Sequence, residues 1–565
     1  MQPIKQIIGK LPGARFLHRF ITAPHTEITR FREFRAFKKG IESYRDVART
    51  SPRKRVLVVS LLGNLTEAAK MEAFLVKSIQ NQNVKCYIVT LRECWSNLYY
   101  RSMGINDFIY FDDYLASVGT VSQDEVATAV SRMTSFDDLM GFERDEVQVG
   151  KYICSTLVRE TYHGHVDLKD PTVREKIIRA SEDSIRNIEA ANQIFNTVRP
   201  DITLFLERGY TPYGEFFDLS LSKGLNTIQW CGSHRNEALT LKRYTHKNRS
   251  DHPATVSKES WSNFESLYSQ TDFKTCVHNE LFAGYKSGDW YGEVGTQFNT
   301  AFYSQDELKR KIGIDTDKKT AAIFSHLFWD ATFFYGEDLF DNYRDWFIES
   351  VKAACENDRV NWLIKLHPAN KVKLKRDGYQ GELVEVQAIR DSIGDLPGHI
   401  KLIYPETDIS TFSLFEMIDY CITVRGTVGI EAACFGKRVF TAGTGRYDHF
   451  GFTLDAETRT DYLNYLRSID TFPAMNEQEV ALAQKYAFIA FVARPFELKS
   501  LRVDYKNDEQ ASMSVQVLPR NDRDFQKQPD VQSFGEWAVN SIDEDYFNGN
   551  VAVAKPVNLS EREGG

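Results

Sequence analysis

Residues 419–447, DYCITVRGTVGIEAACFGKRVFTAGTGRY, most narrowly limit what this chain can fold into. Their pattern predicts a buried strand, a tight turn, a short helix and a second strand, at residues 420–424, 425–427, 428–435 and 438–442. A glycine-bearing turn between the carboxyl end of a strand and the amino end of a helix directs backbone N–H groups outward, which suits a phosphate. Thr427 can cap the helix and offer a hydroxyl, and Arg425 beside Gly426 supplies positive charge. The stretch therefore predicts a phosphate-binding turn in a parallel sheet.

Small residues and one carboxylate follow in the predicted helix. Gly429 has two interpretations, because close packing of helix on sheet and close approach of a ligand both need a small residue. Glu431 can complement the helix dipole or bind a hydroxyl of a sugar or ribose.

A second strand end carries residues that we expect beside this turn. Residues 361–368, NWLIKLHP, form an apolar run that ends in Lys365, His367 and Pro368. Proline after histidine restricts how the chain leaves the strand, and Lys365 falls on the same strand face as His367. In a parallel sheet, these two strand ends predict one diphosphate site. The alternative is a structural histidine bonded to backbone.

Glu207 is the candidate general base. It follows the apolar run at residues 202–206, so partial burial at a strand end would raise its pKa. The alternatives are a salt bridge with Arg208 or a base at Glu215, although the helix-like setting of Glu215 predicts exposure.

Three strand ends in the first half, including the one before Glu207, lead into polar loops that often contain glycine. Such loops are the usual place for ligand groups in parallel sheets. Candidate acceptor-binding residues in these loops are Asn64, Arg208, His234 and Arg235. No G-x-G-x-x-G motif follows the first predicted strand, so a dinucleotide cofactor is not expected.

Charge is distributed unevenly along the chain. Residues 1–55 hold fourteen Lys or Arg against four Asp or Glu, while the whole chain has a net charge of −8. A basic segment with interleaved apolar residues suits an anionic membrane surface, and the alternative is a solvated arm or a helix packed on the body. Because the remainder is acidic, a nucleic acid partner is not expected. No uninterrupted apolar run approaches the roughly 18–20 residues that span a bilayer, and no signal peptide is evident. The expected location is the cytoplasm, with peripheral binding at the inner face of the cell membrane if the basic segment docks there.

Metal and disulfide sites have little support. The eight cysteines are scattered without a C-x-x-C pair. His163 and His165 are two residues apart and near Asp167, which could form a metal site. No further ligand stands at a spacing typical of zinc sites. No metal site is predicted.

The order of three motifs resembles a known family. KLHP at residues 365–368, PETDIST at 405–411 and RGTVGIEAACFGKRVF at 425–440 resemble bacterial capsule and surface-polysaccharide glycosyltransferases of GT-B architecture. The Kdo transferases of capsule assembly have the most similar patterns, and polysialyltransferases and, more distantly, teichoic-acid glycerophosphotransferases are similar in plan. The resemblance implies an α/β fold with two Rossmann-like domains facing across a cleft, a helical insertion and C-terminal helices. It matches His367 to the histidine of the family's His-Pro motif, Thr427 to its phosphate-binding turn and Glu431 to its helix glutamate.

These patterns divide the chain into four parts. They are a basic leader, an acceptor domain with a helical insertion, a nucleotide-sugar domain and a C-terminal extension ending in a mobile tail, at residues 1–50, 51–300, 301–495 and 496–565.

The expected activity is transfer of a sugar from a nucleotide-sugar to a growing surface polysaccharide or a lipid-linked acceptor. Glu207 would deprotonate the acceptor, while Lys365, His367, Arg425 and Thr427 would stabilise charge on the departing nucleotide. The resemblance implies that no metal is required, and no cofactor is expected besides the nucleotide-sugar substrate. Alternatives are a CDP-polyol phosphotransferase, a sugar-nucleotide epimerase and a non-catalytic assembly scaffold.

Overall fold

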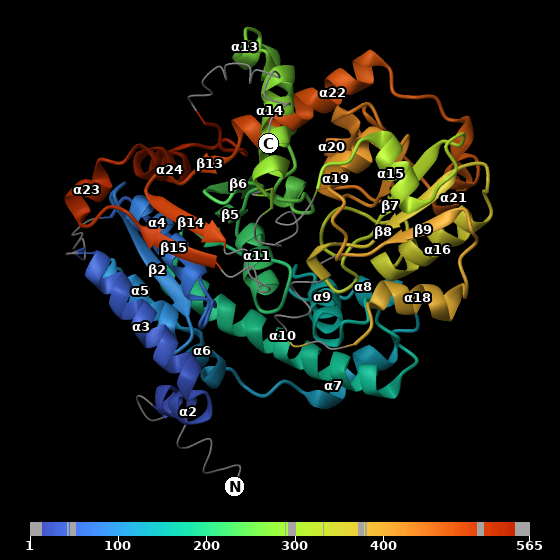
Figure 1. The fold of residues 1–565 in the computed structure, drawn as a ribbon. Helices are drawn as coiled ribbons and strands as arrows, with labels where there is room; N and C mark the ends of the chain where they lie inside the picture. The colour runs from blue at the N-terminus through green and yellow to red at the C-terminus, as the bar shows by residue number, and fades with distance from the viewer. Residues whose placement is uncertain are drawn as a thin grey trace.

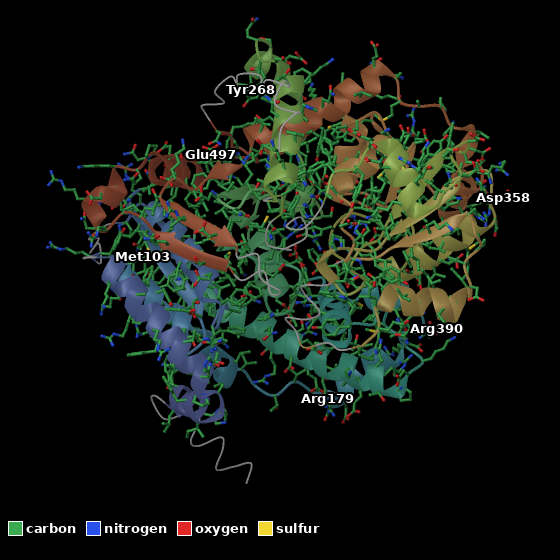
Figure 2. The ribbon with its side chains drawn as sticks, in the orientation of Figure 1. Met103, Arg179, Tyr268, Asp358, Arg390 and Glu497 are labelled. Atoms are coloured by element: carbon green, nitrogen blue, oxygen red, sulfur yellow. The ribbon has the colours of Figure 1, made fainter. Side chains whose placement is uncertain are left out.

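Two α/β units, each built on one mainly parallel sheet, lie side by side in the computed structural model (Figure 1). The structure describes residues 14–41, 44–45, 52–288, 290–291, 301–330, 333–370, 378, 381–505 and 513–548. Arg179, Asp358 and Arg390 project from the outer surface (Figure 2).

The N-terminal sheet has the strand order β13-β6-β5-β4-β1-β2-β3. Its strands are β1 (Lys54–Val59), β2 (Val84–Thr90), β3 (Phe108–Tyr110), β4 (Ile202–Phe205), β5 (Asn226–Gly232), β6 (Ala238–Tyr244) and β13 (Phe496–Glu497). The first five are parallel, and β6 and β13 pair antiparallel at one edge. Because the chain proceeds outward from β1 in one direction and from β4 in the other, the strand order reverses between these two neighbours.

Both faces of this sheet are buried, which explains the continuous apolar runs of its strands. Val56 and Val58 belong to one hydrophobic cluster and Leu57 and Val59 to the other. The covering helices and the helical insertion are α4 (Thr66–Gln80), α5 (Trp95–Ser102), α6 (Phe111–Ser117), α7 (Gln123–Ser131), α8 (Phe136–Met140), α9 (Val149–Thr161), α10 (Pro171–Val198) and α11 (Tyr213–Ser222). The predicted fold class is confirmed for this half.

The C-terminal sheet has the order β12-β11-β10-β7-β8-β9 and is parallel throughout. Its strands are β7 (Thr320–Phe324), β8 (Asn361–Lys365), β9 (Ile400–Ile403), β10 (Tyr420–Thr423), β11 (Arg438–Thr441) and β12 (Thr453–Asp455). Its helices are α15 (Gln305–Ile312), α16 (Tyr343–Cys355), α18 (Val384–Ser392), α19 (Thr411–Met417), α20 (Thr427–Cys434) and α21 (Arg459–Arg467). Here the strand order reverses between β7 and β10.

Further elements lie in the two segments that link the sheets, between β6 and β7 and between β12 and β13. They are α12 (Lys258–Ser262), α13 (Phe264–Tyr268), α14 (Phe273–Ser287), α22 (Glu477–Ala487) and the π-helical turn η4 (Phe488–Ala493), with short 3₁₀ turns η1 (His246–Asn248) and η3 (Ile469–Thr471). After η4 the chain returns to the N-terminal sheet as β13. Among the described residues, no helix combines the length and the apolar composition needed to span a membrane.

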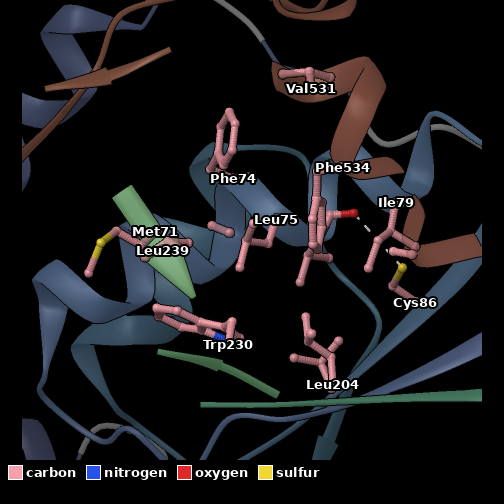
Figure 3. Packing of buried hydrophobic residues seen from close by; sticks show 14 of the residues in the cluster. Met71, Phe74, Leu75, Ile79, Cys86, Leu204, Trp230, Leu239, Val531 and Phe534 are labelled. Carbon is pink, nitrogen blue, oxygen red and sulfur yellow. Dashed lines mark hydrogen bonds between the residues drawn. The ribbon is translucent and has the colours of Figure 1, made fainter. Parts of the chain in front are cut away.

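The predicted C-terminal extension is folded as far as residue 548, and the predicted mobile tail, about the last thirty residues, lies mostly beyond that point and stays a prediction. A hairpin of β14 (Leu501–Tyr505) and β15 (Met513–Val517) precedes α23 (Asp522–Gln526) and α24 (Pro529–Asn540). Val531 and Phe534 of α24 pack beside Phe74 of α4 in the first hydrophobic cluster (Figure 3). Helix α24 has a polar outer face and a buried apolar face. Residues 549–565 lie outside the described ranges.

The basic leader is also helical from residue 14. Helix α2 (Ala14–Thr22) and helix α3 (Pro24–Gly40) lie on the outer side of the N-terminal unit, far from the C-terminal sheet (Figure 1). Residues 1–13 lie outside the description.

Candidate functional site

The predicted phosphate turn lies where the C-terminal sheet reverses its strand order. Helix α20 begins at Thr427, directly after β10, and β10 pairs with β7. In open parallel sheets, ligands bind outside the carboxyl ends of the strands at such a reversal. Gly426, not Thr427, occupies the N-cap position, so the predicted capping role of Thr427 is wrong. Gly426 donates its N–H to the Thr423 hydroxyl at 3.1 Å, and a Cβ on Gly426 would lie 2.8 Å from that oxygen.

Arg446, which the sequence did not single out, contacts this turn. Its Nη2 donates to the Thr427 hydroxyl at 2.6 Å, and its Nη1 donates to the Arg425 carbonyl at 3.2 Å. The side chain is largely buried, and its Nε has no hydrogen-bond partner among the described residues. The guanidinium thus places a positive charge at the amino end of α20, where the helix dipole also favours an anion.

Arg425 itself is turned away from the helix. Its guanidinium pairs with Asp338 and donates to the Tyr335 carbonyl. Burial raises the pKa of Asp338 to about 6, although Arg425 opposes the shift. Arg425 therefore anchors the segment after β7, and its predicted contact with a nucleotide competes with these bonds.

Lys365 lies at the same sheet edge, at the end of β8. Its side chain is 5% exposed, and among the described residues its ammonium makes no hydrogen bond or ion pair. Burial lowers the pKa of Lys365 to about 8, while Glu406 opposes the shift. A buried ammonium without a close counter-charge favours an anionic ligand.

The backbone fixes the orientation of His367. Its N–H donates to the Ser325 hydroxyl at 2.8 Å, and its Nδ1 accepts the N–H of Ala369 at 3.2 Å. With Nδ1 as an acceptor, a neutral imidazole carries its proton on Nε2. His367 is thus held at the edge that carries Lys365.

His326 is a second histidine of this edge, and no sequence pattern marks it. It follows β7, and its Nε2 accepts the Val424 N–H at 3.2 Å and lies 3.0 Å from the Thr423 hydroxyl. Burial, followed by the charges of His367 and two arginines, holds the pKa of His326 well below its ordinary value. The neighbouring positive charges show that several cationic groups converge here.

Gly429 and Glu431 have structural roles. A Cβ on Gly429 would lie 2.2 Å from the Tyr447 hydroxyl, which donates to the Gly426 carbonyl at 2.7 Å. Glu431 is 3% exposed; one carboxylate oxygen accepts from Tyr285 and the other from Trp290 Nε1 at 3.2 Å. Burial raises the pKa of Glu431 to about 7. The predicted contact of Glu431 with a sugar or ribose competes with these bonds.

Glu207 lies where the N-terminal sheet reverses its strand order, just after β4. Its Oε1 accepts the backbone N–H groups of Arg208 at 2.7 Å and Gly209 at 2.8 Å. Burial raises the pKa of Glu207, these two bonds oppose the shift, and the charge of Asp330 adds to it. The carboxylate is thus oriented through one oxygen, and the raised pKa is a shift in the direction that a general base near neutral pH needs.

Glu215 is buried, so the prediction that it is exposed is wrong. Helix α11 turns it toward α10, where its Oε1 accepts from the Ser184 hydroxyl at 2.7 Å and from Asn187 at 3.4 Å. Glu215 therefore joins two helices of the N-terminal unit.

Arg208 connects the two units. It is 2% exposed, and its guanidinium donates to the carbonyls of Arg249 and, at 2.6 Å, Asp251. The same group lies over the Tyr335 ring, 4.8 Å from its centroid. Since Arg425 bonds the Tyr335 carbonyl, one residue of the segment after β7 contacts arginines from both sheet edges. The carboxyl edges of the two sheets therefore face each other.

The remaining acceptor candidates lie at two other strand ends of the N-terminal sheet. Asn64 follows β1, the strand beside β4, and its Oδ1 accepts the Trp95 N–H at 3.3 Å. His234 is buried after β5, and its Nε2 lies 2.7 Å from Glu280. Arg235 is partly exposed, with its Nε 3.3 Å from the same carboxylate.

Tyr291 connects the segment after β5 to the predicted phosphate-binding turn. Its N–H donates to the His234 carbonyl at 2.9 Å, and its hydroxyl accepts from Thr427 at 3.3 Å. Thr427 therefore donates to Tyr291 while it accepts from Arg446. No sequence pattern marks this long-range contact.

Metal-binding clusters are absent from the described residues: no group of three or more His, Cys, Asp or Glu side chains is placed to hold an ion there. His165 directs its Nδ1 to the His163 carbonyl at 3.1 Å, and Asp167 Oδ1 accepts the Lys169 N–H.

Comparison with known proteins gives no family assignment. No family model matches the chain, and no curated protein matches it. Among solved structures, a UDP-GlcNAc 2-epimerase from Neisseria meningitidis bound to UDP-GlcNAc is similar at 12% identity and a TM-score of 0.26, over 77% of this chain and 95% of that chain. KpsC from Thermosulfurimonas dismutans, a beta Kdo 2,4 transferase, is similar at 12% identity and a TM-score of 0.29, over 52% and 80% of the two chains. The spinosyn rhamnosyltransferase SpnG is similar at 10% identity and a TM-score of 0.24, over 78% and 96%. At these scores, the likenesses carry no inference about the activity of this chain.

Proposed function

We propose that this protein is a glycosyltransferase, which moves a sugar from a nucleotide-sugar to a surface polysaccharide or a lipid-linked acceptor at the cytoplasmic face of the cell membrane. The observation that carries the proposal is that the two sheets face each other with their carboxyl edges, and that each edge has a point where the strand order reverses. One places the Arg446 guanidinium at the amino end of α20, and the other presents the Glu207 carboxylate, whose pKa is raised.

The cationic edge suits the departing nucleotide. When the bond from the anomeric carbon to the phosphate oxygen breaks, negative charge develops on the nucleotide's terminal phosphate. Arg446, Lys365, His367 and the amino end of α20 would stabilise that charge. Arg446 replaces Arg425 in this role, because the Arg425 guanidinium is bound to Asp338.

The carboxylate edge suits the acceptor. Glu207 would take the proton of an acceptor hydroxyl as its oxygen bonds to the anomeric carbon. The sugar thus gains a bond to the acceptor, the nucleotide leaves with the bonding electron pair, and Glu207 holds the proton. These groups supply both the base and the leaving-group stabilisation, so the proposed reaction requires no metal and no further cofactor.

Nucleotide binding and release test this function. The purified protein should bind one of UDP, GDP, CMP or CDP by isothermal titration, and it should release that nucleotide from its sugar donor only when acceptor is present. Absence of binding across the panel would leave the scaffold alternative, and would overturn the proposal.

Product analysis separates the enzymatic alternatives. Release of nucleotide or an altered sugar without acceptor would indicate an epimerase. Release of CMP from a CDP-polyol, with phosphate retained on the acceptor, would indicate a polyol-phosphate transferase. Either result would contradict sugar transfer.

A further inference from the structure

The outer face of α2 and α3 concentrates exposed apolar side chains. Of the eleven large hydrophobic residues that are exposed in the described chain, five lie on these two helices: Leu17, Phe20, Ile21, Ile28 and Phe31. Leu17 is 63% exposed and Ile21 is 72% exposed, one helical turn apart on α2. Such a concentration in so short a segment indicates an interaction surface.

The opposite face of the same helices is already packed. Phe34 of α3 lies against the rings of Trp95 and Tyr99 on α5, with centroids 6.2 and 5.3 Å apart. Trp95 Nε1 also donates to the buried carboxylate of Glu27 at 2.7 Å. These contacts fix the rotation of α3, so the exposed residues face outward because the other side is occupied.

Cations share the outward face of α3. Arg32, Arg35 and Lys39 stand four, seven and eleven residues after Ile28, which places all four on one side of a helix. With Lys38 they form an exposed cationic row, and none of these cations makes an ion pair among the described residues. Arg35 also lies over the Phe31 ring, 5.9 Å from its centroid. Apolar and basic side chains are thus interleaved on the outward face of α3, and α2, next to it in the chain, adds Leu17, Phe20 and Ile21 as exposed apolar residues.

We propose that this face docks the protein on the surface of an anionic lipid bilayer, with the apolar side chains inserted between headgroups and the row of cations paired with lipid phosphates. Interfacial helices combine these two features. A nucleic acid would use the cations and leave the five apolar residues in water, and the acidic remainder of the chain would repel it. A second copy of this face would bring the two cationic rows together. The docking stands independently of the proposed reaction.

Vesicle flotation of the full-length protein tests the docking. The protein should float with vesicles of mixed phosphatidylglycerol and phosphatidylcholine, and not with phosphatidylcholine alone. Replacing Arg32, Arg35, Lys38 and Lys39 by Gln should weaken binding by roughly fivefold for each cation removed. The double variant Leu17→Gln, Ile21→Gln should also lower the bound fraction, while the salt dependence of the residual binding is kept.

Matched variants elsewhere control for general effects of charge and hydrophobicity. Lys247, Lys258, Lys274 and Arg310 are cations outside the leader, and their joint replacement by Gln should leave flotation unchanged. Ile542→Gln removes a side chain that is 91% exposed on the other end of the chain, and it should also have no effect.

The outcomes are distinct. Equal flotation of wild type and both leader variants, or no flotation of wild type, would overturn the proposal. If the protein is a dimer that the Leu17 and Ile21 substitutions dissociate, the face belongs to a second copy and the proposal is overturned. The proposal is also overturned if the protein binds nucleic acid and not vesicles, and the quadruple Gln variant abolishes that binding. Unchanged thermal unfolding of the variants would show that loss of binding does not come from loss of folding.

Discussion

Arg446 donates a hydrogen bond of 2.6 Å to the hydroxyl of Thr427, the first residue of α20. The bond holds a guanidinium at the amino end of a helix that begins at a reversal of strand order. Both the helix dipole and the arginine favour an anion there. This pair of residues is the centre of the proposed nucleotide site.

Substitution of Glu207 should remove turnover while donor binding persists. In Glu207→Gln the amide keeps the shape of the side chain but cannot accept the acceptor proton, so kcat should fall by about 10²–10⁴-fold. Glu215→Gln is the matched control, because Glu215 is a buried carboxylate of the same unit that bonds Ser184. Near-normal kcat in Glu207→Gln would show that another group is the base.

Lys365 should make nucleotide binding depend on pH. Because burial lowers its pKa to about 8, the ammonium is charged below that pH and neutral above it. Nucleotide affinity should therefore fall as pH rises through 8, and Lys365→Met should weaken binding at pH 7 by at least about tenfold and abolish this step. Lys437→Met is the control, since burial also lowers the pKa of Lys437 but this residue precedes β11 at the opposite sheet edge. A step that persists in Lys365→Met would contradict the assignment.

His367→Ala should weaken nucleotide affinity without unfolding the protein. The imidazole accepts the Ala369 N–H, and loss of such a bond costs about 1 kcal/mol, so the variant should remain folded. His399→Ala is the control, because His399 lies at the opposite sheet edge, where its Nε2 is 3.1 Å from the Ala354 carbonyl oxygen. Titration calorimetry that gives the same affinity for wild type and His367→Ala would make His367 a structural residue.

Glu431 should lower the stability of the protein as pH rises. Burial raises its folded-state pKa from 4.5 to about 7, so between these values the folded state keeps a proton that the unfolded state has lost. The free energy of unfolding should therefore fall across this window by up to roughly 3 kcal/mol relative to Glu431→Gln. Denaturant unfolding at pH 5, 6, 7 and 8 measures the difference between the two proteins. A difference that stays constant, or rises with pH, would show that the carboxylate is ionised in the fold throughout.

Strands were predictable because local sequence determines them. The predicted strands at residues 420–424 and 438–442 each exceed the observed strands, β10 and β11, by one residue. Both sheets bury both faces, so each strand leaves a continuous apolar run. Helix α24 was not predicted, because the polar residues of its outer face obscure the apolar periodicity of its buried face.

Side-chain partners were not predictable, because they come from distant parts of the chain. Arg425 pairs with Asp338, 87 residues earlier. Glu431 accepts from Tyr285, 146 residues earlier. Local pattern placed an arginine and a carboxylate beside the turn, but only the tertiary contacts show that both are already bonded. Arg446 is nearer in the chain: it follows β11, which pairs in parallel with β10 and so ends at the same sheet edge as the turn.

Nucleotide titration of two arginine variants tests the central proposal most directly. Arg446 and Arg438 are both largely buried, but Arg446 follows β11 at the proposed site, whereas Arg438 begins β11 at the opposite edge and pairs with Glu479. If the site binds a nucleotide diphosphate, Arg446→Gln should weaken the affinity by about 10–100-fold, the value of a charged hydrogen bond, and Arg438→Gln should leave it unchanged. Equal nucleotide affinity in wild type and Arg446→Gln would contradict the account.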